Sequence, residues 1–572
     1  MSARARPPRR ALLLAALAGA AGCSGLPRSG PVVSGARVQD DPRLGLLQVV
    51  PDGPVRGAEP QEVVRGFLLA AATGAGEQAV ARLFLSPAAR RTWRPDASTT
   101  VLVEAPRVEP AAAPAPGEAA VLVSGEALAD VDAGGRYAQR PPGSAVRRTL
   151  RLVRVDGEWR VDEPGDGRWL TQVDASRSLR PFPVCFATPD GAVLVSEARW
   201  FPYDSATATR VVTEVLAGAS PWLAPAVLGG APPGTRLRTG TVPVSDGAAV
   251  VDLTAPARHA SPQRRGVLLA QLRTALTRLP GVERVVVRVE GTELAPGRGP
   301  SPAPDPPLTL PVRDSRLVLA GPAGLARWDR AELRPVPGAP AGRHPAVAAD
   351  ASCVAWLDED ARTLRVLPAG AASPAAVRAR GAVLAPPSVD RHGWVWVVPT
   401  SPGATASVVP AAAPGSTPTA VGSAPGAAGA GVLRARASRD GARLLVLTEE
   451  PDGTTRVRVH GVVRGAGGRP LRVGEGSPEL VPGAGRVLDV SWLRDDRVVA
   501  LVRPAPGADP VPLVSQVSGP VQRLAPVAGA ESVAAGWSER DVVVGTGDGR
   551  LLARSGAGWS TVAQGRDPAY PG

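Results

Sequence analysis

The chain has 572 residues, which is enough for about three domains of ordinary size. Its 65 Gly and 63 Pro favour turn-rich β structure and Pro-rich linkers over long helices. The net charge of +13 comes from arginines scattered among acidic residues, without a basic stripe interleaved with aromatics, so nucleic acid is not an expected partner.

The first 22 residues have the pattern of an export signal. Arginines at positions 4, 6, 9 and 10 precede an uncharged run from Ala11 to Ala21, which is shorter than the roughly 20 residues that span a bilayer. Small side chains at Ala20, Ala21 and Gly22 then precede Cys23. We therefore predict a signal peptide over residues 1–22, cleaved between Gly22 and Cys23.

The residues before Cys23 resemble a lipobox, in which the cysteine is lipidated and becomes the mature N-terminus. The resemblance implies a diacylglycerol and an amide-linked palmitate, and two or more hydrocarbon chains suffice for stable membrane attachment. Ala20 replaces the Leu that is usual three residues before the cysteine, which leaves plain secretion as the alternative. Residues 23–58 are expected to tether the folded part to the outer face of the cell membrane.

The other two cysteines are not expected to form a disulfide. Cys185 and Cys353 lie in segments predicted to belong to different domains, and both have apolar neighbours. Each is expected to be a small buried thiol.

Residues 59–172 are predicted to form a small α+β domain. Apolar residues at helical spacing indicate two helices before residue 87, after which the pattern changes to strands. Asp156-Gly157 marks a hairpin turn whose second strand places Trp159 and Val161 on one face. Two helices followed by a curved antiparallel sheet resemble the NTF2-like cone fold.

Residues 176–292 carry an ordered series of motifs. Two strands in "VCFATPDGAVLVSEARWFP" precede a helix for which Asp204 is the expected N-cap. A hairpin at Asp246-Gly247, a helix from Ser261 to residue 279 and a Val-rich strand follow. This order is similar to the GerMN domain of spore-germination proteins and actinobacterial lipoproteins. The resemblance implies an extracytoplasmic α+β interaction domain without catalytic residues.

A linker separates this segment from the last one. Seven prolines between residues 295 and 311 favour an extended, semi-rigid chain, so residues 293–311 are assigned to the linker. Residues 312–566 lack helical periodicity and repeat an acid-plus-turn element before an apolar strand about every 40 to 55 residues. We predict a C-terminal β-propeller of about six blades, with repeats near Asp350, Asp390, Arg439, Arg494 and Glu539.

The order of anchor, GerMN-like domain and propeller, with the motifs "EARWFP" and "DGAAVVDL" and the Trp-containing strands, resembles the LpqB-type lipoproteins of actinobacteria. The resemblance implies an accessory of the MtrA–MtrB two-component system that acts outside the membrane. The implied partner is the extracellular domain of a membrane sensor histidine kinase (MtrB-like), with effects on cell-wall homeostasis and division.

No pattern of catalytic or metal-ligating residues stands out, so no enzymatic activity, cofactor, metal or small-molecule substrate is expected. No G-x-S-x-G elbow occurs, and a chain without Lys has no P-loop. The acids of "LDED" (357–360) and "RDD" (494–496) are expected to cap solvated turns. The four histidines lie in separate segments without metal-ligand spacing: His259, His344, His392 and His460. Of these, His392 is expected in an exposed turn.

Alternative functions stay open. One is a propeller that binds or hydrolyses cell-wall glycan, and hydrolysis requires two acids that converge on the central face. Another, from the GerMN resemblance alone, is a sporulation or germination component. Five tryptophans at comparable places in the repeats either pack between blades, which we expect, or form an aromatic binding face: Trp356, Trp394, Trp396, Trp492 and Trp537.

Overall fold

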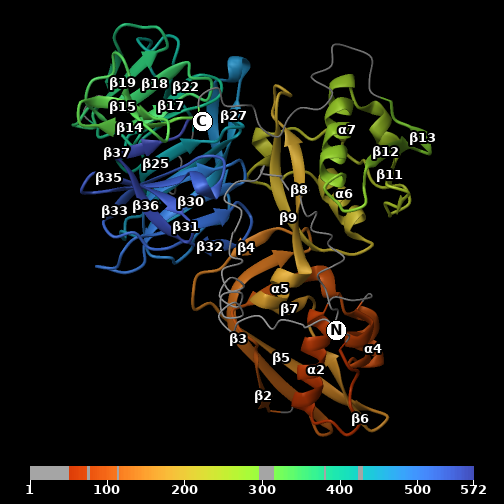
Figure 1. Cartoon of the computed structure of the whole chain (residues 1–572). Helices are drawn as coiled ribbons and strands as arrows, with labels where there is room; N and C mark the ends of the chain where they lie inside the picture. The colour runs from red at the N-terminus through yellow and green to blue at the C-terminus, as the bar shows by residue number, and fades with distance from the viewer. Residues whose placement is uncertain (1–50, 74–77, 113–114, 296–314, 379–381, 423–428) are drawn as a thin grey trace, which may run out of the picture. The chain divides into compact units, whose positions relative to one another are not determined.

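The computed structural model describes residues 51–73, 78–112, 115–295, 315–378, 382–422 and 429–572, which all lie in one compact unit. Strands predominate (Figure 1). We call residues 51–178 the N-terminal module, residues 179–295 the middle module and residues 315–572 the C-terminal module. Gly22 and Cys23 lie outside the described residues.

The N-terminal module packs helices on an antiparallel sheet that ends in one parallel pair. The strand order is β6-β5-β3-β1-β7, with β2 and β4 also paired to β3. Helix α2 buries Val63, Val64 and Phe67 against the sheet, as its periodicity predicts. The predicted hairpin turn is confirmed, because Asp156 (φ 51°) and Gly157 (φ 82°) join β5 to β6. The elements are α2 Pro60–Ala72, α3 Ala79–Leu83, α4 Pro87–Thr92, β1 Ser98–Leu102, β2 Arg107–Ala111, β3 Glu118–Asp132, β4 Tyr137–Gln139, β5 Ala145–Val155, β6 Glu158–Glu163, β7 Arg168–Thr171 and α5 Gln172–Ser178.

The middle module combines a long hairpin, two helices and a second small sheet (Figure 1). Its elements are β8 Leu179–Ala187, β9 Leu194–Pro202, α6 Thr207–Ala217, β10 Val244–Ser245, β11 Ala248–Leu253, α7 Pro262–Leu276, β12 Arg284–Val289 and β13 Thr292–Glu293. Ser261 caps α7 as predicted. The expected cap of α6 is wrong: the helix begins at Thr207, and Asp204 instead binds the Ala206 N–H in the preceding turn. The Asp204 N–H donates to the Thr207 hydroxyl and the Thr207 N–H donates to the Asp204 carbonyl, so residues 204–207 close a separate turn before the helix starts.

The described part of the C-terminal module contains six four-stranded antiparallel sheets. Their first strands contact one another in a closed ring, in the order β17, β21, β25, β29, β33 and β37. From the ring outward the sheets are β37 Arg566–Ala569, β14 Leu317–Gly321, β15 Gly324–Trp328, β16 Leu333–Pro335; β17 Arg343–Val347, β18 Cys353–Leu357, β19 Thr363–Pro368, β20 Ala375–Arg378; β21 Ser388–Val389, β22 Trp394–Val397, β23 Ser407–Pro410, β24 Thr419–Ala420; β25 Gly431–Ala437, β26 Arg443–Glu449, β27 Thr455–Arg464, β28 Pro470–Gly476; β29 Arg486–Leu493, β30 Arg497–Arg503, β31 Val511–Gln516, β32 Val521–Arg523; and β33 Ala530–Ala535, β34 Val542–Thr546, β35 Arg550–Ser555, β36 Gly558–Gln564.

The last strand of the chain closes this ring. β37 pairs with β14, so residues from both ends of the module build one sheet. Because β37 pairs with β14, the edge of β14 that faces the ring is not left unpaired where the first and the last repeats meet.

The middle and C-terminal modules share one hydrophobic core. Phe186 and Leu272 of the middle module belong to the same buried cluster as Leu445 and Val490 of the C-terminal module. The approach is close at Gly461, where a Cβ atom would lie 2.7 Å from the carbonyl oxygen of Trp222. The two modules are therefore packed together rather than joined only by the linker.

Candidate functional site

The two described cysteines are buried free thiols, as predicted. Burial raises the pKa of Cys185 and of Cys353 to about 12. Thiols with such a pKa are protonated at neutral pH and do not act as nucleophiles.

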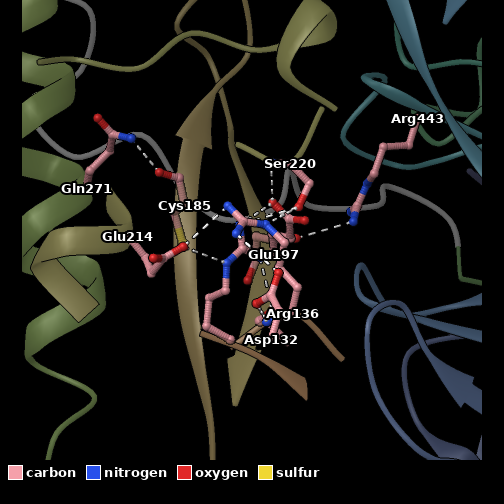
Figure 2. A network of polar contacts seen from close by, with 11 residues as sticks. Asp132, Arg136, Cys185, Glu197, Glu214, Ser220, Gln271 and Arg443 are labelled. Carbon is pink, nitrogen blue, oxygen red and sulfur yellow. Dashed lines mark hydrogen bonds and ion pairs between the residues drawn. The ribbon is translucent and has the colours of Figure 1, made fainter. Parts of the chain in front are cut away.

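The motif "EARWFP" lies at a polar junction between modules. Arg199 of β9 is 0% exposed. Its Nη2 donates to Glu197 Oε2 at 3.0 Å, and its Nε donates to Glu214 Oε2 at 3.4 Å. Figure 2 shows Glu197 and Glu214 within this network of polar contacts. A buried charge of this kind persists only when it is paired and hydrogen-bonded.

The N-terminal module joins the same network. Arg136 donates from Nε to Ser220 Oγ at 3.1 Å, and its Nη2 lies 3.3 Å from Glu214 Oε2 (Figure 2). Burial raises the pKa of Glu214, although both arginines lower it. The backbone also connects the modules, because the Trp200 N–H donates to the Gly135 carbonyl at 2.7 Å.

The C-terminal module contacts the same hairpin. Arg443 donates from Nη1 to the Ser196 carbonyl at 3.3 Å, and Trp200 donates from Nε1 to the Ser518 carbonyl at 2.8 Å. A separate ion pair joins Arg391 to Asp190 at 2.6 Å. The hairpin β8–β9 thus contacts the modules on both sides of it, and its polar groups hold the modules in register rather than facing an open cavity.

A small cavity lies against the inner strands of the ring. It encloses about 40 Å³, room for no more than a few water molecules. Its lining includes Arg436 and Arg439 but no acidic side chain. Arg439 is buried and donates to the carbonyls of Arg494, Ala535, Gly536 and Pro571, while its guanidinium stacks 4.7 Å from the Trp537 ring centre.

Two carboxylates lie near this cavity, and both have partners. Asp489 accepts from Arg434 Nε at 2.7 Å and from the Val533 N–H at 2.9 Å. Asp567 accepts from the His344 N–H at 3.1 Å, and hydrogen bonds from His344 lower the pKa of Asp567 to about 2 although burial opposes them. A carboxylate with such a pKa carries no proton to donate at neutral pH.

Three of the five tryptophans follow the packing interpretation. Trp356, Trp396 and Trp492 are buried in the clusters between sheets, and Trp394 packs partly against one of them. Trp537 is half-buried beneath Arg439.

Two expectations about polar residues are wrong. His392 lies in the predicted turn but is half-buried, and burial lowers its pKa to about 4. Asp495 does not cap a solvated turn: its Oδ1 is buried without a hydrogen bond, and burial together with Asp440 raises its pKa to about 6. Both are covered by segments distant in the sequence, which local pattern does not reveal.

The described residues contain no group of three or more His, Cys, Asp or Glu side chains placed to hold a metal ion. Within the same residues, no helix combines the length and the apolar character needed to cross a membrane.

Three family models match the chain. "Lipoprotein LpqB, N-terminal domain" matches residues 53–176, "Sporulation and spore germination" matches residues 183–295, and "Lipoprotein LpqB beta-propeller domain" matches residues 323–571. The middle match agrees with the GerMN resemblance.

Two solved structures align with parts of the chain. TolB from Acinetobacter baumannii aligns with 46% of this chain and 68% of its own, at 17% identity and a TM-score of 0.33. The tandem GerMN domains of GerM from Bacillus subtilis align with 26% of this chain and 59% of their own, at 16% identity and a TM-score of 0.19.

Curated relatives match nearly the whole chain. Lipoprotein LpqB of Thermobifida fusca is 29% identical over 96% of this chain and 97% of its own length. Lipoprotein LpqB of Streptomyces coelicolor is 28% identical over 96% of each chain, and that of Streptomyces avermitilis is 28% identical over 100% of each. With LpqB models at both ends and full-length relatives of that name, the chain belongs to the LpqB lipoprotein family.

Proposed function

We propose that this lipoprotein is anchored through Cys23 at the outer face of the cytoplasmic membrane, where it binds the extracellular domain of a sensor histidine kinase of the MtrB type. Binding modulates the kinase and thereby cell-wall homeostasis and division. The protein acts without catalysis. A partner that binds one signalling state more tightly than another shifts the equilibrium by that difference in affinity.

The observation that carries this proposal is the three-module junction at "EARWFP". Arg136 connects the N-terminal module to Glu214 of the middle module, which Arg199 of the hairpin also binds. Arg443 of the C-terminal module binds the hairpin itself, at the Ser196 carbonyl. A membrane-proximal segment and a propeller joined in this way present fixed surfaces to a partner, which lowers the entropic cost of binding.

The glycan-hydrolase alternative receives no support from the ring. Glycosidases place two carboxyl groups about 5 to 10 Å apart across a sugar. The central cavity is far too small for a sugar and is lined by Arg436 and Arg439, and the nearby Asp489 and Asp567 are both engaged. The sporulation alternative rests on the middle module alone, whereas the relatives of this chain match over its full length.

The test is in vivo crosslinking followed by purification from membranes, with Cys23 intact and with Cys23→Ala. We expect the intact chain to recover the kinase and the variant to recover much less, because the anchor concentrates both partners in one plane. Failure to recover a sensor kinase with the intact chain would remove the kinase proposal. Equal recovery with Cys23→Ala would contradict the role of the anchor.

A further inference from the structure

A larger cleft lies on the C-terminal module and shares no lining residue with the ring cavity. It encloses about 380 Å³ against strands β26, β27 and β28. That volume is within the range of pockets for small molecules, which begins at about 300 Å³. Its polar lining includes Arg456, Arg458, His460 and Glu475.

Strand β27 brings three basic side chains to this cleft. Arg456, Arg458 and His460 alternate with Val457 and Val459, which are buried on the opposite face in the shared core. The motif "TRVRVH" thus has one apolar face that packs and one basic face that lines the cleft.

A break in strand pairing keeps the cleft open. The register of β27 against β28 shifts between His460 and Val462, opposite the glycines of β28. A Cβ atom at Gly476 would lie 3.0 Å from Arg458 Cδ and 3.0 Å from His460 Cε1. A larger residue would fill the space that both side chains border.

His460 presents a lone pair to the cleft. The residue is 7% exposed, and burial lowers its pKa, so the ring is neutral at pH 7. Nδ1 lies 3.0 Å from the Gly474 carbonyl and must donate to it, which leaves Nε2 as an acceptor. None of the described residues donates a hydrogen bond to Nε2.

Arg458 has no carboxylate of its own. Its neighbour Arg456 pairs with Glu479 at 2.8 Å, but none of the described acids lies within ion-pair distance of the half-buried Arg458. Glu475 is exposed at the rim of the cleft. The cleft therefore offers one unpaired guanidinium, one neutral imidazole acceptor and one rim carboxylate.

We propose that this cleft binds a sugar ring that carries an acidic group. The Arg458 guanidinium binds the acidic group, His460 Nε2 accepts a hydrogen bond from a ring hydroxyl, and Glu475 accepts from another hydroxyl at the rim. The site does not depend on the kinase proposal, and no bond is made or broken there.

The test titrates the full-length chain with D-glucuronate, D-glucose and inorganic phosphate, by calorimetry and by NMR of the four histidine rings. We expect glucuronate to bind and to shift the His460 resonances more than those of His259. Glucose and phosphate should each bind at least tenfold more weakly, because each lacks one of the two recognised groups. Arg458→Gln should weaken glucuronate binding at least tenfold.

The matched control is Arg472→Gln, which removes an equal charge from an exposed position on β28 outside the cleft. We expect it to bind glucuronate as the unaltered chain does. Arg458→Gln should keep its unfolding midpoint, since its guanidinium has no partner to lose. Absence of glucuronate binding, equal weakening by both variants, or phosphate binding as tightly as glucuronate would overturn the proposal.

Discussion

Arg199 illustrates what a fully buried charge requires. Its guanidinium is held by Glu197 and Glu214, and the buried Glu197 loses its arginine partner if it is removed. We expect Arg199→Met to cost about 3 to 5 kcal/mol of stability, seen as a lower midpoint in urea unfolding. The control is Arg238→Met, whose pair with Asp252 leaves the arginine 48% exposed and should cost less than about 1 kcal/mol. Equal midpoints for the two variants would contradict this role for Arg199.

Asp495 is the clearest pH-dependent residue. Its folded-state pKa of about 6 lies above the unfolded value of about 3.9, so protonation of Asp495 stabilises the folded chain. This stabilisation is complete below about pH 4 and is lost as the pH rises through 6. Asp495→Asn should therefore raise the free energy of unfolding by about 3 kcal/mol at pH 7.5, seen as a higher melting temperature, and change it little at pH 4.

The control for Asp495 is Asp509→Asn at an exposed position, where we expect no stabilisation at either pH. Thermal unfolding followed by circular dichroism at both pH values measures the difference. A melting temperature for Asp495→Asn below that of the unaltered chain at pH 7.5 would show that the carboxylate is favourably bound instead.

At the scale of elements, the closing strand β37 is the most sensitive segment. It supplies the inner strand of the first sheet and contacts β17 and β33 on either side. Deletion of residues 565–572 should open the ring, expose the edge of β14, and make the C-terminal module sensitive to limited proteolysis. Leu333→Ser on the exposed outer strand β16 should leave the proteolysis pattern unchanged. A truncated chain as resistant as the intact one would contradict the closing role.

The repeat in the sequence corresponds to the second strand of each sheet in the C-terminal module. The apolar strands near Asp350, Asp390, Arg439, Arg494 and Glu539 are the second strands of their sheets: β18, β22, β26, β30 and β34. Second strands are buried on both faces between neighbouring sheets, so they are continuously apolar and the easiest to recognise. The short first strand β21 and the outer strand β24, of two residues each, have no periodic pattern to detect.

At the scale of the whole molecule, the proposed function depends on the anchor at Cys23. If Cys23 is lipidated, cells fed an alkyne analogue of palmitate should yield labelled protein in the membrane fraction. Cys23→Ala should be unlabelled and recovered outside that fraction, because a chain without attached lipid lacks the two or more hydrocarbon chains needed for stable membrane binding. The control is Cys185→Ala, which should be labelled normally because Cys185 is a buried thiol. Unlabelled but secreted wild-type protein would establish plain secretion instead.

The sequence alone determined the properties that depend on neighbouring residues. Periodicity identified α2 and the cap at Ser261 identified α7, and Asp156-Gly157 identified a hairpin, because helix, cap and turn are stabilised within a few residues. The order of motifs indicated the family. Only the tertiary structure decided which charges are buried together: Arg199 and Arg136 share Glu214, Arg443 reaches the Ser196 carbonyl of the same hairpin, and Arg458 is left unpaired beside His460. The reason is physical, since burial and pairing of a charge depend on chain segments up to about 250 residues away, and local pattern carries no record of them.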